Sequence, residues 1–374
     1  MKKNMQLPSP LNIHLSLTNS CNFRCTICPS MREDKKYNRP DMDSRLLKTI
    51  IETVLPKVNT MILGGNSLGE VTTHKDFPVF LADEFNSDSS IQVRLTTNGY
   101  RIGEFAGPIA NKFSFVGISF DGATRETYES IRRYPFKKIV GNIEKLTNER
   151  SKINSKLKVG LGMTLLYKNV SELPDLIDLA ADIGVDSVVG SFFIPNFPSE
   201  RYECLYYHQK YANDMADIAA ERAKERGLDF RMPRYCLPDT QLTEADKEPV
   251  YMKCDLPFSM MNISETGIIT PCCANPTIMG DLKKESIEEI WNGKRYVRFR
   301  ENAGANFYCG ICHTPVFGKY ASTGFVLDPT YQIKTIGTQL SPLLALRAGG
   351  FQMLYGSKTG RKFINLSKAV LGRK

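Results

Sequence analysis

Ten cysteines are spread along this 374-residue chain in a pattern that suits metal chemistry. Three lie within one short segment, Cys21-Asn-Phe-Arg-Cys25-Thr-Ile-Cys28. The others divide into a late group and two isolated residues, which are Cys254, Cys272, Cys273, Cys309 and Cys312, and then Cys204 and Cys236. Because the first residues contain no apolar segment of the secretory type, the clustered thiols favour metal or iron–sulfur ligation over disulfide bonds.

The early triplet places three thiolates in one tight loop, directly after a predicted strand. This arrangement suits a [4Fe–4S] cluster and leaves a fourth iron able to bind a small chelating molecule. A zinc site is the alternative, but zinc requires a fourth Cys or His nearby. The nearest histidine, His14, lies on the preceding predicted strand. The spacing therefore predicts an iron–sulfur cluster at Cys21, Cys25 and Cys28.

The elements that must position this loop follow a strand-then-helix alternation. We expect strands at 11–17, 61–63, 91–96, 113–120, 157–166 and 186–194, and helices at 43–54, 77–85, 101–111, 134–148 and 170–183. Six such repeats in about 190 residues predict parallel strands with helical crossovers, in a barrel or an open sheet. In both arrangements, ligands bind at the carboxyl ends of the strands.

The polar segments 64–70, 97–99 and 121–122 each follow a predicted strand, as the cysteine loop does. Together with the C-x3-C-x2-C spacing of the three cysteines, these segments resemble those of the radical S-adenosylmethionine (AdoMet) enzymes. The resemblance covers roughly residues 10–200. It implies an α/β fold, in the form of a partial (β/α)6 TIM-like barrel.

The resemblance also assigns cofactor contacts to particular residues. It implies that Phe23 packs near the adenine of AdoMet. It further implies that Gly69 and Glu70, in Leu68-Gly-Glu-Val71, meet the amino group of AdoMet. Val71 departs from the proline of the family's Gly-Glu-Pro motif, whereas the Glu70 carboxylate remains. Three further residues at strand ends are predicted to bind the cofactor by the same likeness, namely Asn98, Ser119 and Asp121.

Radical AdoMet enzymes use a reduced [4Fe–4S] cluster, coordinated with AdoMet, to break a carbon–sulfur bond of that cofactor. The resulting 5′-deoxyadenosyl radical removes an unactivated hydrogen from the substrate. The cofactor supplies the chemistry, so the protein has to position it and exclude water. The resemblance also implies an external one-electron donor such as flavodoxin or ferredoxin.

Cys254, Cys272, Cys309 and Cys312 form a second set that can converge on one metal centre. They flank a predicted hairpin at 258–269, which turns at 265–267, and a predicted helix at 286–301. This pattern is similar to the SPASM/twitch extensions of radical AdoMet enzymes, which are small hairpin–helix domains with auxiliary iron–sulfur clusters. Because no cysteine follows Cys312, it resembles the shortened twitch form with one fully ligated auxiliary [4Fe–4S] cluster. A four-cysteine zinc site is the alternative.

The remaining cysteines are Cys204, Cys236 and Cys273. Each is either a small buried hydrophobic residue or a hydrogen-atom donor to a substrate radical. Cys273 adjoins Cys272 and points to the opposite side if the segment is extended. No histidine is distinguished as a catalytic base.

Composition sets broader limits. Lys and Arg number 49 against 40 Asp and Glu, a net charge of +9. The excess lies at 329–374, which holds no acidic residue, so the nearly neutral body argues against nucleic-acid binding. We expect a core at 8–200, a helical connector at 201–250, an auxiliary-cluster domain at 251–325 and a basic tail at 326–374. The tail is either a solvated terminus or a contact for an acidic partner or an anionic membrane surface. Since no apolar run is long enough to span a bilayer, we expect a cytoplasmic protein.

A fully ligated auxiliary cluster has no open iron for substrate, which predicts an electron-accepting role and a net two-electron oxidation. We therefore expect an oxidoreductase that abstracts hydrogen from a hydroxylated small molecule, such as a sugar or aminocyclitol. One alternative is a maturase of a ribosomal peptide, against which we expect no room for a peptide-recognition domain before residue 11. Another is a radical epimerase in which one of the three remaining cysteines donates hydrogen. A zinc-stabilised binding module is the non-enzymatic alternative.

Overall fold

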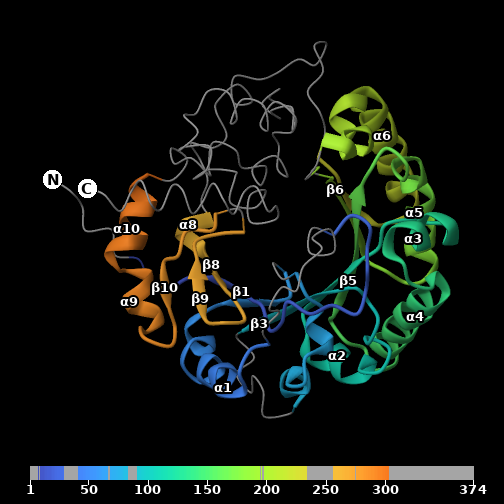
Figure 1. The fold of residues 1–374 in the computed structure, drawn as a ribbon. Helices are drawn as coiled ribbons and strands as arrows, with labels where there is room; N and C mark the ends of the chain where they lie inside the picture. The colour runs from blue at the N-terminus through green and yellow to red at the C-terminus, as the bar shows by residue number, and fades with distance from the viewer. Residues whose placement is uncertain are drawn as a thin grey trace.

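The computed structural model describes residues 7, 9–28, 41–65, 68–82, 91–193, 195, 198–233, 256–273 and 275–302. Within them, a curved sheet of ten strands forms the centre of the fold, in the order β10-β9-β8-β1-β2-β3-β4-β5-β6-β7. The sheet follows an incomplete ring with helices along its outer, convex side (Figure 1). The α/β class and the partial barrel predicted from the sequence are confirmed.

The strands from β8 through β1 to β7 pair in parallel with their neighbours. In contrast, β9 pairs antiparallel with both β8 and β10. Their bounds are β1 Asn12–Leu15, β2 Thr60–Leu63, β3 Gln92–Thr97, β4 Phe115–Ser119, β5 Lys158–Leu165, β6 Ser187–Phe192, β7 Asp229–Arg231, β8 Met260–Ile263, β9 Ile268–Thr270 and β10 Gly280–Asp281. Each of the six strands expected from the sequence is present, as β1 to β6.

Helical segments connect the strands. The α-helices are α1 Ser44–Thr53, α2 Ala106–Lys112, α3 Arg125–Arg132, α4 Phe136–Lys152, α5 Leu173–Asp182, α6 Gln209–Arg226, α8 Leu256–Ser259, α9 Ile287–Trp291 and α10 Lys294–Glu301. The 3-10 turns are η2 Leu55–Lys57, η3 Val71–Thr73, η4 Phe77–Leu81, η5 Val170–Glu172, η6 Pro198–Glu203 and η7 Leu205–His208. None of the helices in this part of the chain combines the length and apolarity that crossing a bilayer requires.

The two faces of the sheet differ in composition because side chains alternate along each strand. On β3, Val93 and Leu95 are buried and belong to the main hydrophobic core, together with α2 and α4 residues such as Ile109 and Ile143. Arg94 and Thr96 therefore lie on the opposite, concave face, which the ring of strands encloses. We call this the inner face.

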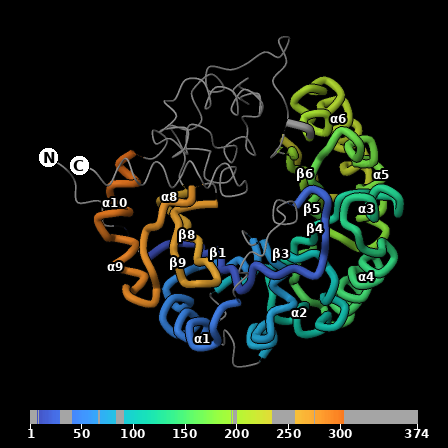
Figure 2. Tube along the Cα trace, viewed as in Figure 1, coloured from blue at the N-terminus to red at the C-terminus, as the bar shows by residue number. Residues whose placement is uncertain are grey.

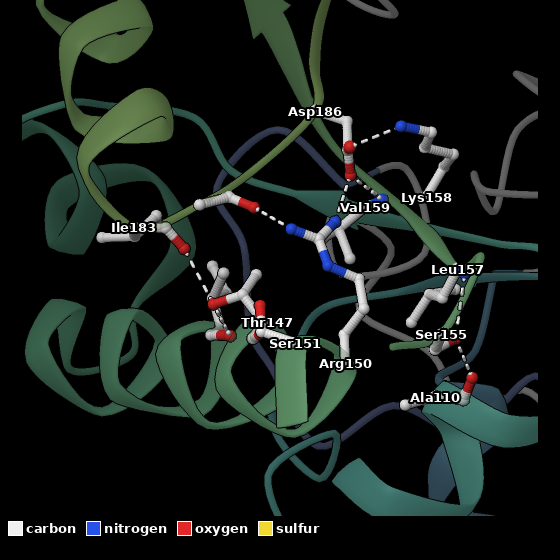
Figure 3. Close-up of polar contacts among 12 residues, drawn as sticks. Ala110, Thr147, Arg150, Ser151, Ser155, Leu157, Lys158, Val159, Ile183 and Asp186 are labelled. Atoms are coloured by element: carbon white, nitrogen blue, oxygen red, sulfur yellow. Dashed lines mark hydrogen bonds and ion pairs between the residues drawn. The ribbon is translucent and has the colours of Figure 1, made fainter. Parts of the chain in front are cut away.

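A polar network at the amino ends of β5 and β6 locks α4 against the sheet (Figure 3). Asp186 accepts hydrogen bonds from the Val159 amide at 2.8 Å and from Lys158 Nζ at 2.9 Å, and it pairs with Arg150. Burial acts to raise the pKa of Asp186, but these hydrogen bonds and the Arg150 charge hold it below its ordinary value. Thr147 on α4 adds a bond to the Ile183 carbonyl at 2.8 Å. These contacts lie at the end of the barrel opposite to the cysteine loop.

The C-terminal part of the described chain continues the sheet of the barrel. β8 pairs in parallel with β1, so that Asn262 lies opposite His14, and Figure 2 shows β8 and β9 beside β1. The predicted hairpin is confirmed, and its turn is formed where Gly267, with φ of 83°, donates to the Ser264 carbonyl. The auxiliary-cluster region is thus continuous with the core sheet.

Several expected elements differ from those observed. The predicted helix at 77–85 is the 3-10 turn η4 in its described part. The helical connector expected at 201–250 does not begin as one long helix, because η6 and η7 precede α6. The helix at 286–301 is divided into α9 and α10, because Gly293 is extended, with φ of −67° and ψ of 158°. The sequence prediction also missed α3 and β7, and β7 shows that the expected helical connector contains a strand.

Part of the sequence-based expectation lies outside the described residues. This holds for the late cysteines Cys254, Cys309 and Cys312, for Cys236, and for the basic tail at 326–374. Their predicted roles stay predictions.

Candidate functional site

The three early cysteines follow β1 in a compact loop at the carboxyl end of the sheet. Cys25 is buried, and Cys21 and Cys28 are half-buried. The loop closes on itself through the Cys28 amide, which donates to the Cys25 carbonyl at 3.2 Å. Arg24 Nη1 donates to the carbonyls of Cys21 and Phe23 at 2.7 and 2.8 Å. These bonds fix the backbone from which the three thiols project.

Burial and mutual proximity govern the pKa values of two of the loop thiols. Burial raises the pKa of the Cys21 and Cys25 thiols, and the other thiols of the loop add to this. The thiols therefore lie close enough to influence one another. Yet among the described residues no three Cys, His, Asp or Glu side chains converge as ligands of a single metal ion. In a [4Fe–4S] cluster each of the three cysteines binds a different iron, so their sulfur atoms need not meet at one point.

The buried residue Glu70 connects this loop to the end of β3, and we call its set of hydrogen bonds the Glu70 brace. Its Oε1 accepts hydrogen bonds from the Thr72 amide, the Thr72 hydroxyl and the Thr97 hydroxyl at 3.2, 2.6 and 2.6 Å. Its Oε2 accepts from the Asn98 amide at 2.7 Å, and the Glu70 amide donates to the Ser20 carbonyl at 2.8 Å. The carboxylate is 3% exposed and holds the two segments together. Its predicted contact with AdoMet stays a prediction.

The residues on either side of Glu70 explain the local motif. Gly69 packs directly on the chain that enters the cysteine loop, since a Cβ there would lie 2.3 Å from the Thr18 carbonyl oxygen and 2.6 Å from that of Ser20. Val71 is the first residue of η3. At this position the backbone amide has no partner within the helix, so proline, which lacks the amide hydrogen, loses no bond there. Valine can occupy the same position without losing a bond either.

Asn98 links the brace to the cysteines. Its Nδ2 donates to Asn22 Oδ1 at 2.8 Å and lies 3.9 Å from Cys21 Sγ. Its Oδ1 accepts from the Tyr100 amide at 3.0 Å. Ser119, at the end of β4, is half-buried on the inner face. The structure thus brings Asn98 to the cysteine loop and places Ser119 at the end of the neighbouring strand.

An aromatic cluster surrounds Phe23. The Phe23 ring stacks on that of Tyr134 with centroids 4.4 Å apart, and the edge of Tyr100 meets Tyr134 at 5.1 Å. Phe23 is 2% exposed. Neither tyrosine was predicted as a site residue from the sequence, because neither belongs to a spaced motif. Their place beside an aromatic residue within a cysteine triplet becomes visible only in three dimensions.

A buried ion pair supports Cys25 from the side of α3. Arg132 Nε lies 2.6 Å from Asp121 Oδ2, and the other oxygen of Asp121 accepts from the Thr164 amide at 2.7 Å. Arg132 Nη1 lies 3.9 Å from Cys25 Sγ, and the Cys25 thiol donates to the Arg132 carbonyl at 3.7 Å. Burial opposes protonation of Arg132, but Asp121 and Cys25 raise its pKa. The structure therefore places Asp121 in contact with Arg132, a residue that the sequence did not single out.

Replacing Arg132 by methionine should lower the free energy of unfolding by about 3–5 kcal/mol, because Asp121 is fully buried and would lose its counter-charge. Denaturant unfolding of the cluster-loaded protein measures this loss. The double variant Asp121→Asn/Arg132→Met should recover much of it, since no unpaired charge is left. Equal losses in the single and double variants would contradict the ion-pair explanation.

Two protein-family models match this chain. The model described as the radical SAM superfamily matches residues 15–180, and the model described as an iron–sulfur cluster-binding domain, SPASM, matches residues 254–314. The chain contains a radical SAM domain and a SPASM domain, as the sequence pattern predicted. These two domains imply [4Fe–4S] clusters and AdoMet as cofactors, which the donor set of the cysteine loop fits.

Individual relatives extend over most of this radical SAM protein. The tungsten-containing aldehyde ferredoxin oxidoreductase cofactor-modifying protein of Pyrococcus furiosus is 22% identical over 77% of this chain and 82% of its own. The AdoMet-dependent heme synthase of Methanosarcina barkeri is 22% identical over 81% and 88%. Among solved structures, Streptococcus suis SuiB bound to AdoMet is 16% identical and superposes with a TM-score of 0.60, covering 84% of this chain and 73% of SuiB.

The SPASM match includes all four cysteines of the predicted auxiliary cluster, of which Cys272 lies in the described part. Cys272 is buried and Cys273 is exposed, in a bend that follows β9. Nearby, the Arg300 guanidinium stacks over Trp291 at 3.9 Å and donates to the Pro257 carbonyl at 2.9 Å, which connects α10 to α8. Cys204 is buried, and its thiol donates to the Phe193 carbonyl at 3.7 Å.

His14, on the inner face of β1, gives this radical SAM protein a titratable group beneath the site. Burial, together with the positive charge of Arg94, lowers the pKa of His14 to about 4. Between that value and about 6.5 the unfolded chain binds the proton and the folded chain does not, so acidification destabilises the fold. From pH 7 to pH 5 we expect this residue to cost about 2 kcal/mol of unfolding free energy. Denaturant unfolding at both pH values measures this loss of stability. The variant His14→Gln should show no such loss, and an equal loss in the variant would assign the pH dependence to other groups.

Proposed function

We propose that this protein is a radical AdoMet oxidoreductase that removes hydrogen from a hydroxylated small molecule, such as a sugar or an aminocyclitol. The observation that carries the radical chemistry is the cysteine loop, joined through Asn98 and the Glu70 brace to the carboxyl end of the sheet. When bound there, the cluster and AdoMet supply a 5′-deoxyadenosyl radical. The remaining steps depend on how this chain positions the reacting groups.

The residues around the loop divide into those that contact AdoMet and those that hold the contacts in place. We assign direct contact to Phe23, Gly69, Asn98 and Ser119, which border the loop or lie at neighbouring strand ends. Glu70 and Asp121 act by position, because protein groups already bind their carboxylates. The stacked rings of Phe23 and Tyr134 exclude water from one side of the loop, which protects a reactive radical.

The late cysteines support the oxidative outcome. Cys254, Cys272, Cys309 and Cys312 supply four thiolates, which is enough to ligate a [4Fe–4S] cluster completely. Such a cluster would accept the electron left after a hydrogen atom is abstracted from an alcohol carbon and a proton leaves its hydroxyl, which gives a carbonyl product. An external donor such as flavodoxin or ferredoxin would supply the electron that starts each cycle.

A second candidate is a peptide-modifying enzyme, and a specific likeness favours it. SuiB has been solved with its precursor peptide SuiA, and anSMEcpe with the peptide Cp18Cys. Both share the fold of this chain, with TM-scores of 0.56 and 0.54. Relatives that resemble the chain in sequence are named for haem, for a metal cofactor and for the PqqA peptide, so they cover both substrate classes.

Substrate-dependent formation of 5′-deoxyadenosine tests the proposal. The reconstituted protein, with AdoMet and dithionite, is offered polyols and aminocyclitols deuterated at the alcohol carbons, and in parallel a set of peptides. We expect a polyol or aminocyclitol to transfer deuterium to 5′-deoxyadenosine and to yield a product lighter by two hydrogens. Stimulation by peptides alone would favour the second candidate, and a product that gains one solvent hydrogen would indicate epimerisation. No 5′-deoxyadenosine under any condition would overturn the radical chemistry itself.

A further inference from the structure

Three polar side chains lie at one level of the inner face, on strands that are far apart in the sequence. They are Asn262 on β8, His14 on β1 and Arg94 on β3. In the register of the sheet, His14 lies opposite Asn262 of β8 on one side and opposite Ile62 of β2 on the other. Ile62 in turn lies opposite Arg94, so the three polar residues form one row across the strands. Parallel neighbours in register point to the same face of a sheet, so the three side chains share this face.

Arg94 carries a half-buried guanidinium that forms neither an ion pair nor a side-chain hydrogen bond with any described residue. It stacks over the Phe115 ring, with its Cζ 4.6 Å from the ring centroid. The ring itself lies against Gly160 of β5, where a Cβ would be 2.9 Å from the Phe115 Cζ atom. The stack fixes the plane of the guanidinium and leaves its N–H edge available.

The other two residues also carry unsatisfied polar atoms. His14 Nδ1 and Asn262 Oδ1 are buried and have no hydrogen-bond partner among the described residues. Buried polar atoms in folded proteins are nearly always paired with protein, water or ligand, so these atoms call for an explanation. With its pKa near 4, His14 is neutral at pH 7, and its ring then offers one donor and one acceptor.

Arg94 brings a positive charge to this part of the inner face. Burial lowers the pKa of Arg94, and the positive charge of Arg231 adds to the effect. Arg231 lies on β7, at the far edge of the sheet, so its influence indicates that the curved sheet brings the two arginines towards each other. Arg231 is paired with Asp229, whereas Arg94 has no counter-charge among the described residues. A half-buried, unneutralised arginine favours an anion.

We propose that Arg94, together with His14 in the tautomer protonated at Nδ1, binds an oxyanion group of the substrate, a carboxylate or a phosphate, while Asn262 Oδ1 accepts a hydrogen bond from a hydroxyl or N–H of the same molecule. This inference rests on the proposed function, because it assigns the group to the substrate of the radical site. Arg94 precedes Asn98, which contacts the cysteine loop, by four residues, or about 13 Å along an extended chain. A molecule anchored at Arg94 can therefore extend towards the cysteine loop. The planar, bidentate guanidinium is suited to a carboxylate or phosphate in a way that a lysine is not.

Phenylglyoxal labelling of arginine side chains, read out by mass spectrometry, tests the site directly. The cluster-loaded protein is first saturated with AdoMet, so that its cofactor site is filled. We expect Arg94 to be labelled, and pyrophosphate or succinate at about ten times its dissociation constant to slow this labelling about tenfold. Arg201 is the matched control, because it also stacks over an aromatic ring, Tyr202, but is exposed. Its labelling should not change.

The two probes distinguish the sources of the oxyanion, since protection by succinate alone indicates a carboxylate and protection by pyrophosphate alone a phosphate. Arg94→Gln should weaken binding of the protecting anion at least tenfold, and Arg94→Lys should fall between that variant and the wild type. Arg201→Gln should bind the anion as the wild type does. Unchanged labelling of Arg94 with both anions, or equal binding by Arg94→Gln, would overturn the inference. Because these measurements need no turnover, they stand apart from the 5′-deoxyadenosine assay that tests the proposed function.

Discussion

The variant in which Cys21, Cys25 and Cys28 are all replaced by alanine should lose about half of its iron and all AdoMet cleavage. The wild type, reconstituted without oxygen, should hold about eight irons, four for each cubane cluster, and the variant about four. The physical reason is that this loop supplies all three thiolates for the cluster at the end of β1, whereas the late cysteines are separate in the sequence. Iron and sulfide analysis, together with chromatographic detection of 5′-deoxyadenosine, measures both effects.

Cys204→Ala is the control for iron content, because the Cys204 thiol is buried and donates to the Phe193 carbonyl rather than facing the loop. It should retain about eight irons. If the wild type holds only about four, the late cysteines bind zinc or no metal, and the electron-accepting role fails. If the triple variant keeps all of its iron, the assignment of the early triplet is wrong.

Gly69→Ala should have the second-largest effect. An added methyl would lie 2.3 Å from the Thr18 carbonyl oxygen and 2.6 Å from that of Ser20, and backbone atoms cannot rotate away as a flexible side chain can. We expect a loss of about 1–3 kcal/mol in unfolding free energy, from overpacking of a tight site. Because the Glu70 brace would move away from the cysteine loop, 5′-deoxyadenosine formation should fall by about 10²-fold.

The matched control is Gly141→Ala, in the interior of α4, where a Cβ would have no heavy atom within 4 Å. This change should stabilise the protein by about 0.5–1 kcal/mol, because alanine restricts the unfolded chain and favours helix. Chemical denaturation and the 5′-deoxyadenosine assay are run on both variants. Equal behaviour of the two would show that close packing at Gly69 is not what positions the brace.

Much of the fold follows from local patterns. Alternating apolar strands and amphipathic helices predicted β1 to β6 in order, and Gly267 marked the turn of the later hairpin. Local patterns did not predict the break between α9 and α10, because a single glycine is tolerated in many helices. They also missed α3, which begins at a local cap where the Thr124 hydroxyl accepts from the Thr127 amide at 3.3 Å. Glu172, distant in the sequence, holds this cap, because its carboxylate accepts from the Thr124 amide and hydroxyl at 3.0 and 2.9 Å.

The candidate site, like the fold, was predicted from the sequence only in part. The spacing of Cys21, Cys25 and Cys28 pointed to the cluster, since three ligands within eight residues form one loop in almost any fold. Asp121 was expected to bind the cofactor, and its buried ion pair with Arg132, which also lies 3.9 Å from Cys25 Sγ, was not predicted. Sequence spacing cannot reveal such a pair, because the energy of a charge depends on burial and on the neighbours that folding supplies.

The sequence by itself therefore determined the chemistry of the cysteine loop and the alternation of strands and helices, because both depend on residues close along the chain. Only the tertiary structure decided that β8 pairs with β1, which places Asn262 beside His14 and level with Arg94. These residues come from distant parts of the chain, and their level is set by strand order and register. Whether a polar atom lacks a partner is likewise decided by burial, which exists only in the folded molecule.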